Sequence, residues 1–248
     1  MLQSSHIPLP PMHLAQGPDL PRSVLVVEHD VTDLARERER RERTLKQLVA
    51  ALTAAVDRRD CFASDQSTRV AALARTIALE MGLSPELAET AETAGNLMNF
   101  GKLLVPPELL TKAGQLSEEE RALIRASIQT TADIIAGIEF DGPVVETLRE
   151  MQERVDGNGP RGLKGEAIPV TARVVAVANA FVAMASPRAY RSGGDVDGAV
   201  DALLRETGSA FDRRVVAALI TYLDSRGGRA EWAAMANGGN AGSHGAAT

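Results

Sequence analysis

Apolar residues recur at steps of three and four along most of this chain, and that spacing restricts the fold more than any other feature. A typical stripe consists of Val70, Leu73, Ile77 and Met81. Such spacing places side chains on one face of an α-helix. Aromatic residues make up only 3% of the chain, so small aliphatic residues must fill the core. This composition suits closely packed helices, and we predict an all-α bundle.

Turn and capping signals divide the chain into separate helices. We expect one helix over about 66–81 and a second that starts with Ser84 as its N-cap and Pro85 in its first turn. Ser117 and Glu120 have the spacing of a capping box, for a helix that reaches about residue 136. Further helices are expected over about 141–154, 169–186, 195–206 and 212–226.

The N-terminal part contains three different segments. Residues 1–22 are rich in Pro, Ser and Gln without periodicity, and we expect them to be disordered. The apolar, β-branched run that begins at Ser23 predicts a short strand. Residues 36–43 spell RERERRER, which is typical of a charged helix. The sheet partners of such a strand are not evident in this chain, so it would be an orphan edge.

Residues 23–43 resemble the last strand of a PAS sensory domain and the linker helix that follows it. An equally good interpretation is a polar helix that follows a chance apolar run. In either case the helix continues over about 31–56 with a leucine stripe, which favours a homodimer through this helix. Arg38 and Arg41 occupy stripe positions in its first half, and they favour a solvated helix there.

Composition excludes several classes of function. No apolar run approaches the roughly 20 residues that a membrane-spanning helix needs. The net charge of -6 gives no support for nucleic-acid binding. The single cysteine, Cys61, excludes an intramolecular disulfide and fits a reducing compartment. Because the N-terminus also lacks the pattern of a signal peptide, we expect a cytoplasmic protein.

The positions of the histidines restrict the chemistry further. The four are His6, His13, His29 and His244, so none lies between residues 30 and 243. A zinc site of the usual kind cannot be built from a body with one thiol and no imidazole. Carboxylates alone could hold magnesium or calcium, but no spaced Asp/Glu cluster suggests such a site. We therefore expect no metal and no cofactor.

Two stretches look functional. Residues 97–106 read as the last turn of a buried helix, a tight Gly-Lys turn and a short extended segment. Asn99 and Lys102 are polar groups within this apolar stretch, and buried polar groups need partners. Residues 155–168, VDGNGPRGLKGEAI, form a glycine-rich loop with no predicted secondary structure. A loop of this length inside a compact domain is usually functional.

Several motifs together resemble those of HD-GYP domains. The similar segments are QSTRV from Gln66 (HSxRV), residues 97–106 (LHDIGKIGIP), residues 151–169 (HHERxDGxGYPxGLKGEEIP), residues 172–191 (ARILAVADxFDALTSxRPYR) and GSAFD from Gly208 (GTxFDP). The resemblance covers residues 44–226, and we expect residues 227–248 to be a mostly disordered tail. It implies an HD-domain helical bundle of bacterial origin that hydrolyses cyclic di-GMP with two or three bound metal ions.

The metal-binding positions of that family are all replaced here. They fall on Gln66, Met98, Asn99, Ser127, Met151, Gln152 and Asn179. His→Met and His→Gln remove the imidazole nitrogen, and Asp→Asn removes the charge that neutralises a divalent cation. The metals of such hydrolases lower the pKa of a bound water and neutralise the phosphate. The GYP motif also lacks its tyrosine, since Pro160 follows Gly159 directly.

The resemblance with these departures indicates a catalytically inactive signalling module. It would act through protein partners or by binding cyclic di-GMP without hydrolysis. The alternative is an active, metal-dependent cyclic di-GMP phosphodiesterase with an atypical site.

Three cations are candidates for holding the phosphates of a nucleotide, because the family has phosphate-facing groups at these positions: Lys102, Arg188 and Arg191. In the alternative interpretation they pair with carboxylates in a structural network, for which Glu153, Asp156 and Glu166 are candidates. The two methionines at the replaced positions are expected to pack as apolar filler. The amides of Gln66, Asn99, Gln152 and Asn179 are expected to hydrogen-bond one another.

Overall fold

The computed structural model describes residues 2–8, 24–30, 32–58, 65–112, 115, 117–186 and 195–238. The chain divides into two compact units, Met1–Leu48 and Val49–Thr248. The long helix α1 (Thr32–Asp57) begins in the first unit and ends in the second, in agreement with the helix expected over 31–56. None of the helices within the described ranges is long and apolar enough to cross a membrane.

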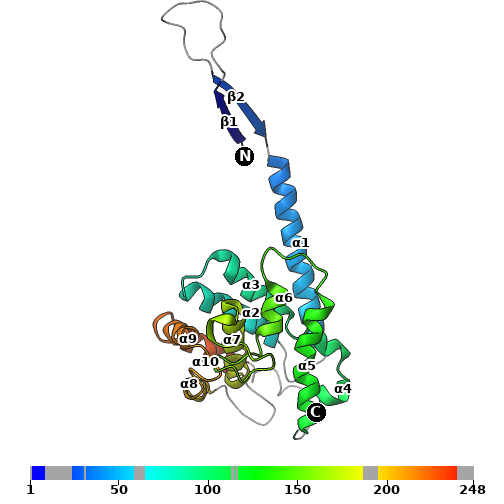
Figure 1. Cartoon of the computed structure of the whole chain (residues 1–248), viewed down its shortest axis with the longest axis vertical. Coiled ribbons are helices and arrows are strands. Elements are labelled where there is room, and N and C mark those ends of the chain that lie inside the picture. Colours follow the sequence, from blue (N-terminus) through cyan, green and yellow to red (C-terminus); the bar gives the residue numbers. More distant parts are fainter. Residues whose placement is uncertain are drawn as a thin grey trace, which may run out of the picture. The chain divides into compact units, whose positions relative to one another are not determined.

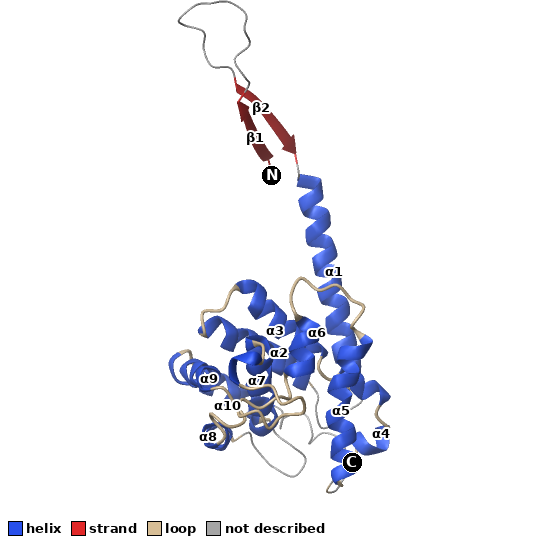
Figure 2. Ribbon diagram, viewed as in Figure 1, coloured by secondary structure: helices blue, strands red, loops and turns tan. Residues whose placement is uncertain are grey.

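The first unit also contains a two-stranded antiparallel ladder (Figure 2). The predicted strand is present as β2 (Val24–Asp30), but it is not an orphan edge, because it pairs with β1 (Leu2–Pro8). Part of the segment that we expected to be disordered is therefore its partner. Ladder hydrogen bonds join backbone groups, so β1 can pair without an apolar pattern of its own. The resemblance to a PAS domain stays a prediction.

The second unit is a helical bundle, as predicted (Figure 1). Its core is built on α2 (Gln66–Glu80), α3 (Pro85–Leu97) and α7 (Val170–Ala185). A Cβ atom added at Gly95 of α3 would lie 2.7 Å from the Cα of Ala71 in α2. The backbones of these two helices are therefore in direct contact. Small residues, which the composition led us to expect in the core, make this close packing possible.

The remaining elements of the second unit surround this core. They are η1 (Phe100–Leu104), α4 (Pro107–Leu110), α5 (Glu118–Ile134), α6 (Val144–Glu150), η2 (Gly165–Ala167), α8 (Val196–Arg205), α9 (Arg213–Ser225) and α10 (Gly228–Gly238). The predicted caps are confirmed. Ser84 accepts a hydrogen bond from the Leu87 N–H, and Ser117 and Glu120 form the reciprocal bonds of a capping box.

Two local predictions were wrong in detail. The segment after Asn99 forms the 3-10 helix η1 rather than a tight turn with an extended segment. The helix expected to reach residue 154 ends at Glu150, because the residues that follow enter the glycine-rich loop. Pro107 occupies the first turn of α4, where its missing N–H costs nothing.

Helix α10 is the largest difference from the expected fold, because residues 227–248 read as a mostly disordered tail. Its side chain Trp232 is only 4% exposed, and its ring meets that of Phe181 edge to face with centroids 5.0 Å apart. The Tyr222 hydroxyl donates a hydrogen bond of 2.7 Å to Glu231 of the same helix. The buried side chain of Trp232 thus anchors α10 to the bundle, although the composition of this segment did not predict a helix.

Candidate functional site

The seven replaced ligand positions come from five segments of the bundle. Gln66 starts α2, Met98 and Asn99 follow α3, Ser127 lies on α5, Met151 and Gln152 follow α6, and Asn179 lies on α7. Within the described ranges, no group of three or more His, Cys, Asp or Glu side chains could hold a metal ion. The residues at these positions therefore do not fit a divalent cation, which prefers imidazole and carboxylate ligands.

Three buried side chains, one of which is Asn99, form a chain of hydrogen bonds in which each donor and acceptor can be assigned. Asn99 Nδ2 donates to Ser67 Oγ over 2.9 Å, and Ser67 Oγ donates to Asp57 Oδ1 over 2.7 Å. The Ser67 N–H also donates to Asp57 Oδ2 over 3.1 Å. A hydroxyl has one proton, and here Asp57 receives it. Residue 99 must therefore donate to Ser67, which an amide can do and an ionised carboxylate cannot.

Asp57 is the central residue that sequence reasoning missed. It ends α1 just before two arginines, in the segment between two predicted helices. Burial raises the pKa of Asp57 above its ordinary value, while the hydrogen bonds from Ser67 and the positive charge of Lys102 act in the opposite direction. Asp57 continues the buried face of α1 that carries Thr53 and Val56. This helical spacing is the signal that could have identified it as a buried residue.

A second set of contacts fixes η1 against α5. Thr131 Oγ1 accepts a hydrogen bond of 2.7 Å from the Gly101 N–H and lies 3.2 Å from the Met98 carbonyl oxygen. A Cβ atom at Gly101 would lie 1.9 Å from the carbonyl oxygen of Ser127, so the two backbones are in direct contact. The Ser127 hydroxyl donates to the Ile124 carbonyl of its own helix over 2.7 Å. This packing holds the Asn99–Lys102 segment in place.

The expected hydrogen bonds among the four amides are confirmed only for one pair. Gln66 Nε2 lies 3.5 Å from Asn179 Oδ1. Asn99 instead binds Ser67, and Gln152 Nε2 donates to the backbone carbonyl of Arg125 over 2.9 Å. The reason is that nearer acceptors are available to both amides. The methionines behave as expected, since Met98 and Met151 are both buried in the main core.

The three candidate phosphate-binding cations are only partly described. Lys102 is half-buried and lies near Asp57, where its charge lowers the pKa of that carboxyl group against the effect of burial. Arg188 and Arg191 lie outside the described residues. Their contribution to a nucleotide site therefore stays a prediction.

The glycine-rich loop is organised by its own acidic residues. Buried Glu153 accepts hydrogen bonds from the backbone N–H groups of Arg161 (2.6 Å) and Leu163 (3.0 Å). Asp156 pairs with Arg154 over 3.1 Å, and this contact lowers the pKa of Asp156. Arg154 and loop amides are the donors that the structure describes for Glu153 and Asp156, and the pairing of these carboxylates with the three candidate cations stays a prediction.

Gly159 of this loop packs directly against Glu153. An added Cβ atom would be 2.5 Å from Glu153 Oε2 and 2.7 Å from the Arg154 nitrogen, so a larger residue would displace one of them. The loop is thus held by hydrogen bonds and close packing within the chain. The 3-10 turn η2 is its only regular element among the described residues.

Comparison with known families gives the same assignment as the motifs. A family model described as "HD domain" matches residues 20–215. The chain belongs to the HD domain family. The all-α bundle is therefore an HD domain, and the HD-GYP resemblance agrees with the names of its relatives.

Three relatives illustrate the relationship. The cyclic di-GMP phosphodiesterase response regulator RpfG of Xanthomonas campestris is 33% identical over 208 residues, which cover 83% of this chain and 54% of that protein. A cyclic di-GMP phosphodiesterase of Thermotoga maritima is 32% identical, covering 65% of this chain and 45% of the relative. The 3′3′-cGAMP-specific phosphodiesterase 1 of Vibrio cholerae is 34% identical, with coverages of 55% and 32%. This HD-domain chain spans about half the length of these relatives or less.

Two solved structures share the fold. A Vibrio cholerae cyclic GMP-AMP phosphodiesterase, V-cGAP3, has a TM-score of 0.58 at 18% identity, covering 75% of this chain and 50% of that chain. Bd1817 of Bdellovibrio bacteriovorus, described as an HDG"Y"P protein, has a TM-score of 0.53 at 20% identity, with coverages of 64% and 51%. At these identities the likeness concerns the fold alone.

The directed hydrogen bonds predict a specific effect of restoring the family's carboxylate. Asn99→Asp places an acceptor against the Ser67 hydroxyl, whose proton is already given to Asp57. We expect the free energy of unfolding at pH 8 to fall by about 2–3 kcal/mol. Chemical denaturation measures this loss.

The loss should depend on pH with a definite sign. Burial beside Asp57 should raise the pKa of the new carboxyl group, so its stabilising protonated form is fully present below the unfolded pKa and is lost as pH rises through the folded pKa. The difference in stability between the variant and the wild type should thus shrink as the pH falls from 8 to 5. Gln47→Glu, on an exposed residue of α1, is the control without this pattern. Equal stability of Asn99→Asp and wild type at pH 8 would contradict the assignment of the donors.

Proposed function

We propose that this HD domain is a catalytically inactive, HD-GYP-like regulatory module of bacterial cyclic di-GMP signalling. It acts in the cytoplasm by binding a protein or a cyclic dinucleotide without hydrolysis. One observation carries the proposal. Asn99, one of the positions that the resemblance assigns to metal ligands, is engaged in the Asp57–Ser67–Asn99 chain of hydrogen bonds.

Two features of this site argue against hydrolysis. Metal-dependent phosphodiester hydrolysis needs a cation that lowers the pKa of a water and neutralises the phosphate. Asp57 is the one buried carboxylate in the hydrogen-bond chain, and both of its oxygens accept hydrogen bonds from Ser67. Met98 and Met151, two further positions that the resemblance assigns to metal ligands, are buried in the hydrophobic core.

The names of the relatives support the class of ligand. Two of them are named for cyclic di-GMP and one for 3′3′-cGAMP, and both molecules are cyclic dinucleotides. Lys102, together with Arg188 and Arg191, would supply positive charge to the phosphates without a metal. Binding without turnover would make the domain a receptor, and its output would be a change in protein interaction.

A calorimetric titration with cyclic di-GMP tests this proposal. The heat of binding is expected to be the same with and without added Mn²⁺, because the site offers no metal ligands. Saturable binding identifies a receptor, and it should be lost in Lys102→Ala with Arg191→Ala. Lys112→Ala, which removes a surface pair with Glu120, is the matched control. Binding that appears only with metal would overturn the proposal and support the atypical enzyme.

Helix α1 supports a homodimer as part of this function. Leu45, Leu48 and Leu52 lie at steps of three and four on α1, and they are 62%, 55% and 46% exposed. A second copy of the chain that presents the same stripe would bury these side chains in a coiled coil. We expect a dimer in sedimentation equilibrium at micromolar concentration, and a monomer after Leu45→Glu with Leu48→Glu. Arg43→Glu, on the opposite face of the helix, is the control. A wild-type monomer would refute this arrangement.

A further inference from the structure

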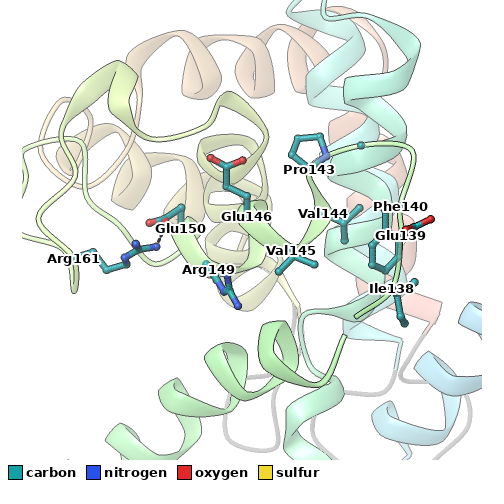
Figure 3. Close-up of a pocket in the computed structure, with 11 residues that line it drawn as sticks. Ile138, Glu139, Phe140, Pro143, Val144, Val145, Glu146, Arg149, Glu150 and Arg161 are labelled. Carbon is teal, nitrogen blue, oxygen red and sulfur yellow. Dashed lines mark hydrogen bonds and ion pairs between the residues drawn. The ribbon is translucent and has the colours of Figure 1, made fainter. Parts of the chain in front are cut away.

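The bundle carries a recess whose lining contains none of the seven replaced ligand positions. It is a groove of about 810 Å³ that follows α6, from Ile138 and Phe140 at one end to Arg161 of the glycine-rich loop at the other (Figure 3). Its floor is held firmly, because Thr147 of α6 shares a buried hydrogen bond of 2.6 Å with Thr171 of α7. A rigid groove on a helix is a suitable surface for a partner.

The two ends of the groove differ in chemistry. One end is mostly apolar and is lined by Ile138, Phe140, Pro143, Val144 and Val145, with Glu139 beside Phe140 (Figure 3). The other end is charged and is lined by Glu146, Arg149, Glu150 and Arg161. Ile138 is 54% exposed, which is high for an aliphatic residue beside other apolar side chains. An occupant that matches both ends must itself be amphipathic.

The charges of the lining favour a cationic occupant. Arg149 Nη2 already lies 3.5 Å from Asp133 Oδ1, outside the groove. Glu139 and Glu146 form no hydrogen bond or ion pair with other residues in the described part of the chain. The lining therefore contains two carboxylates that are available to a basic group.

Glu150 strengthens this argument because it is buried and only half satisfied. The residue is 5% exposed, its Oε1 accepts a hydrogen bond from Arg161 Nη1, and its Oε2 has no partner within the described structure. Buried carboxylate oxygens normally accept hydrogen bonds. The side chain of Arg161 is 56% exposed, so it can move away and let another basic group reach Glu150.

The exposure of the lining favours a protein segment over a small molecule. Ile138, Glu139, Pro143, Glu146 and Arg161 are all exposed, so the groove covers an occupant from one side only. Small ligands usually have 70–90% of their surface buried in their sites. A segment of a partner protein needs no such enclosure, since the rest of the partner can cover it.

We propose that this groove docks a segment of a partner protein that carries a lysine or arginine close to an aliphatic or aromatic residue. The basic group binds Glu146 and Glu150, and the apolar side chain packs on Ile138 and Phe140. This inference rests on the protein-interaction form of the proposed function, for which it names the surface and the chemistry of the partner.

A selection with random peptides tests the proposal even though the partner protein is unidentified. Phage that display random 12-residue peptides are selected on the full-length protein and counter-selected on the Glu146→Gln/Glu150→Gln variant. The enriched peptides should carry a basic residue within a few positions of an apolar one. A synthetic enriched peptide should shift the backbone amide NMR signals of residues 138–150 and 161.

Single substitutions then assign the contacts. Glu146→Gln, on an exposed side chain, should weaken binding of that peptide about threefold, and Glu150→Gln about tenfold. Arg161→Ala should strengthen binding, because it removes the cation that competes for Glu150. Glu108→Gln on α4, outside the groove, is the control and should change nothing.

Several results would overturn the proposal. The selection could enrich acidic peptides, or it could yield no clones whose binding depends on Glu146 and Glu150. The peptide could shift NMR signals only on other surfaces, or Arg161→Ala could abolish its binding. The cyclic di-GMP titration is independent of all of these. If the selection failed but the protein still bound cyclic di-GMP, the docking proposal for this groove would be refuted and the proposed function would be unaffected.

Discussion

Incubation of the purified protein with cyclic di-GMP or 3′3′-cGAMP is expected to yield no linear dinucleotide above the level of buffer alone. Enzymes exceed the uncatalysed rate by about 10⁶-fold or more, and this chain should lose that entire factor because its site cannot hold the activating metal. The assay is chromatographic detection of product with Mn²⁺ or Fe²⁺ added. The Thermotoga maritima relative, named a cyclic di-GMP phosphodiesterase, is the positive control under the same conditions.

Metal analysis of the same preparation separates the two interpretations of the chain. An inactive module should contain no stoichiometric manganese, iron or zinc after purification. Asn99→Asp alone should not restore turnover, since the other ligand positions stay amide, thioether or hydroxyl. Turnover together with one or more bound metal ions per chain would contradict the proposed function and establish the atypical enzyme.

Gly101→Ala is expected to prevent stable folding of the bundle. The new methyl group would lie 1.9 Å from the Ser127 carbonyl oxygen and 3.0 Å from the Thr131 nitrogen, and both are backbone atoms of α5. Relief requires η1 to move away from α5, which also breaks the Gly101–Thr131 hydrogen bond. We expect a loss of about 4 kcal/mol or more in the free energy of unfolding, at the upper end for a single substitution.

Thermal denaturation and soluble yield measure this effect. Gly137→Ala is the matched control, because a Cβ atom there meets no other atom within 4 Å. That variant should unfold within a few degrees of the wild type. If Gly101→Ala melted like Gly137→Ala, the close contact of η1 with α5 would be wrong, and so would the position of the Asn99–Lys102 segment.

Features that depend on neighbouring residues could be predicted from the sequence alone. The caps at Ser84 and Ser117 belong to this group, because a helix start is set by contacts within three residues. The helical stripes predicted the all-α bundle for a similar reason. The absence of histidine between residues 30 and 243 also followed from the sequence, because it depends on residue identity alone.

The polar groups that meet in the site could be found only in the folded chain. Asn99 and Ser67 are 32 residues apart, and their hydrogen bond exists because α2 and α3 pack backbone to backbone. Asp57 precedes two arginines in the sequence, and it is buried only because the chain folds around it. Helix α10 likewise depends on a site for Trp232 beside Phe181 of α7. That site exists only after the bundle has assembled, so no pattern within the Gly- and Ala-rich tail could reveal it.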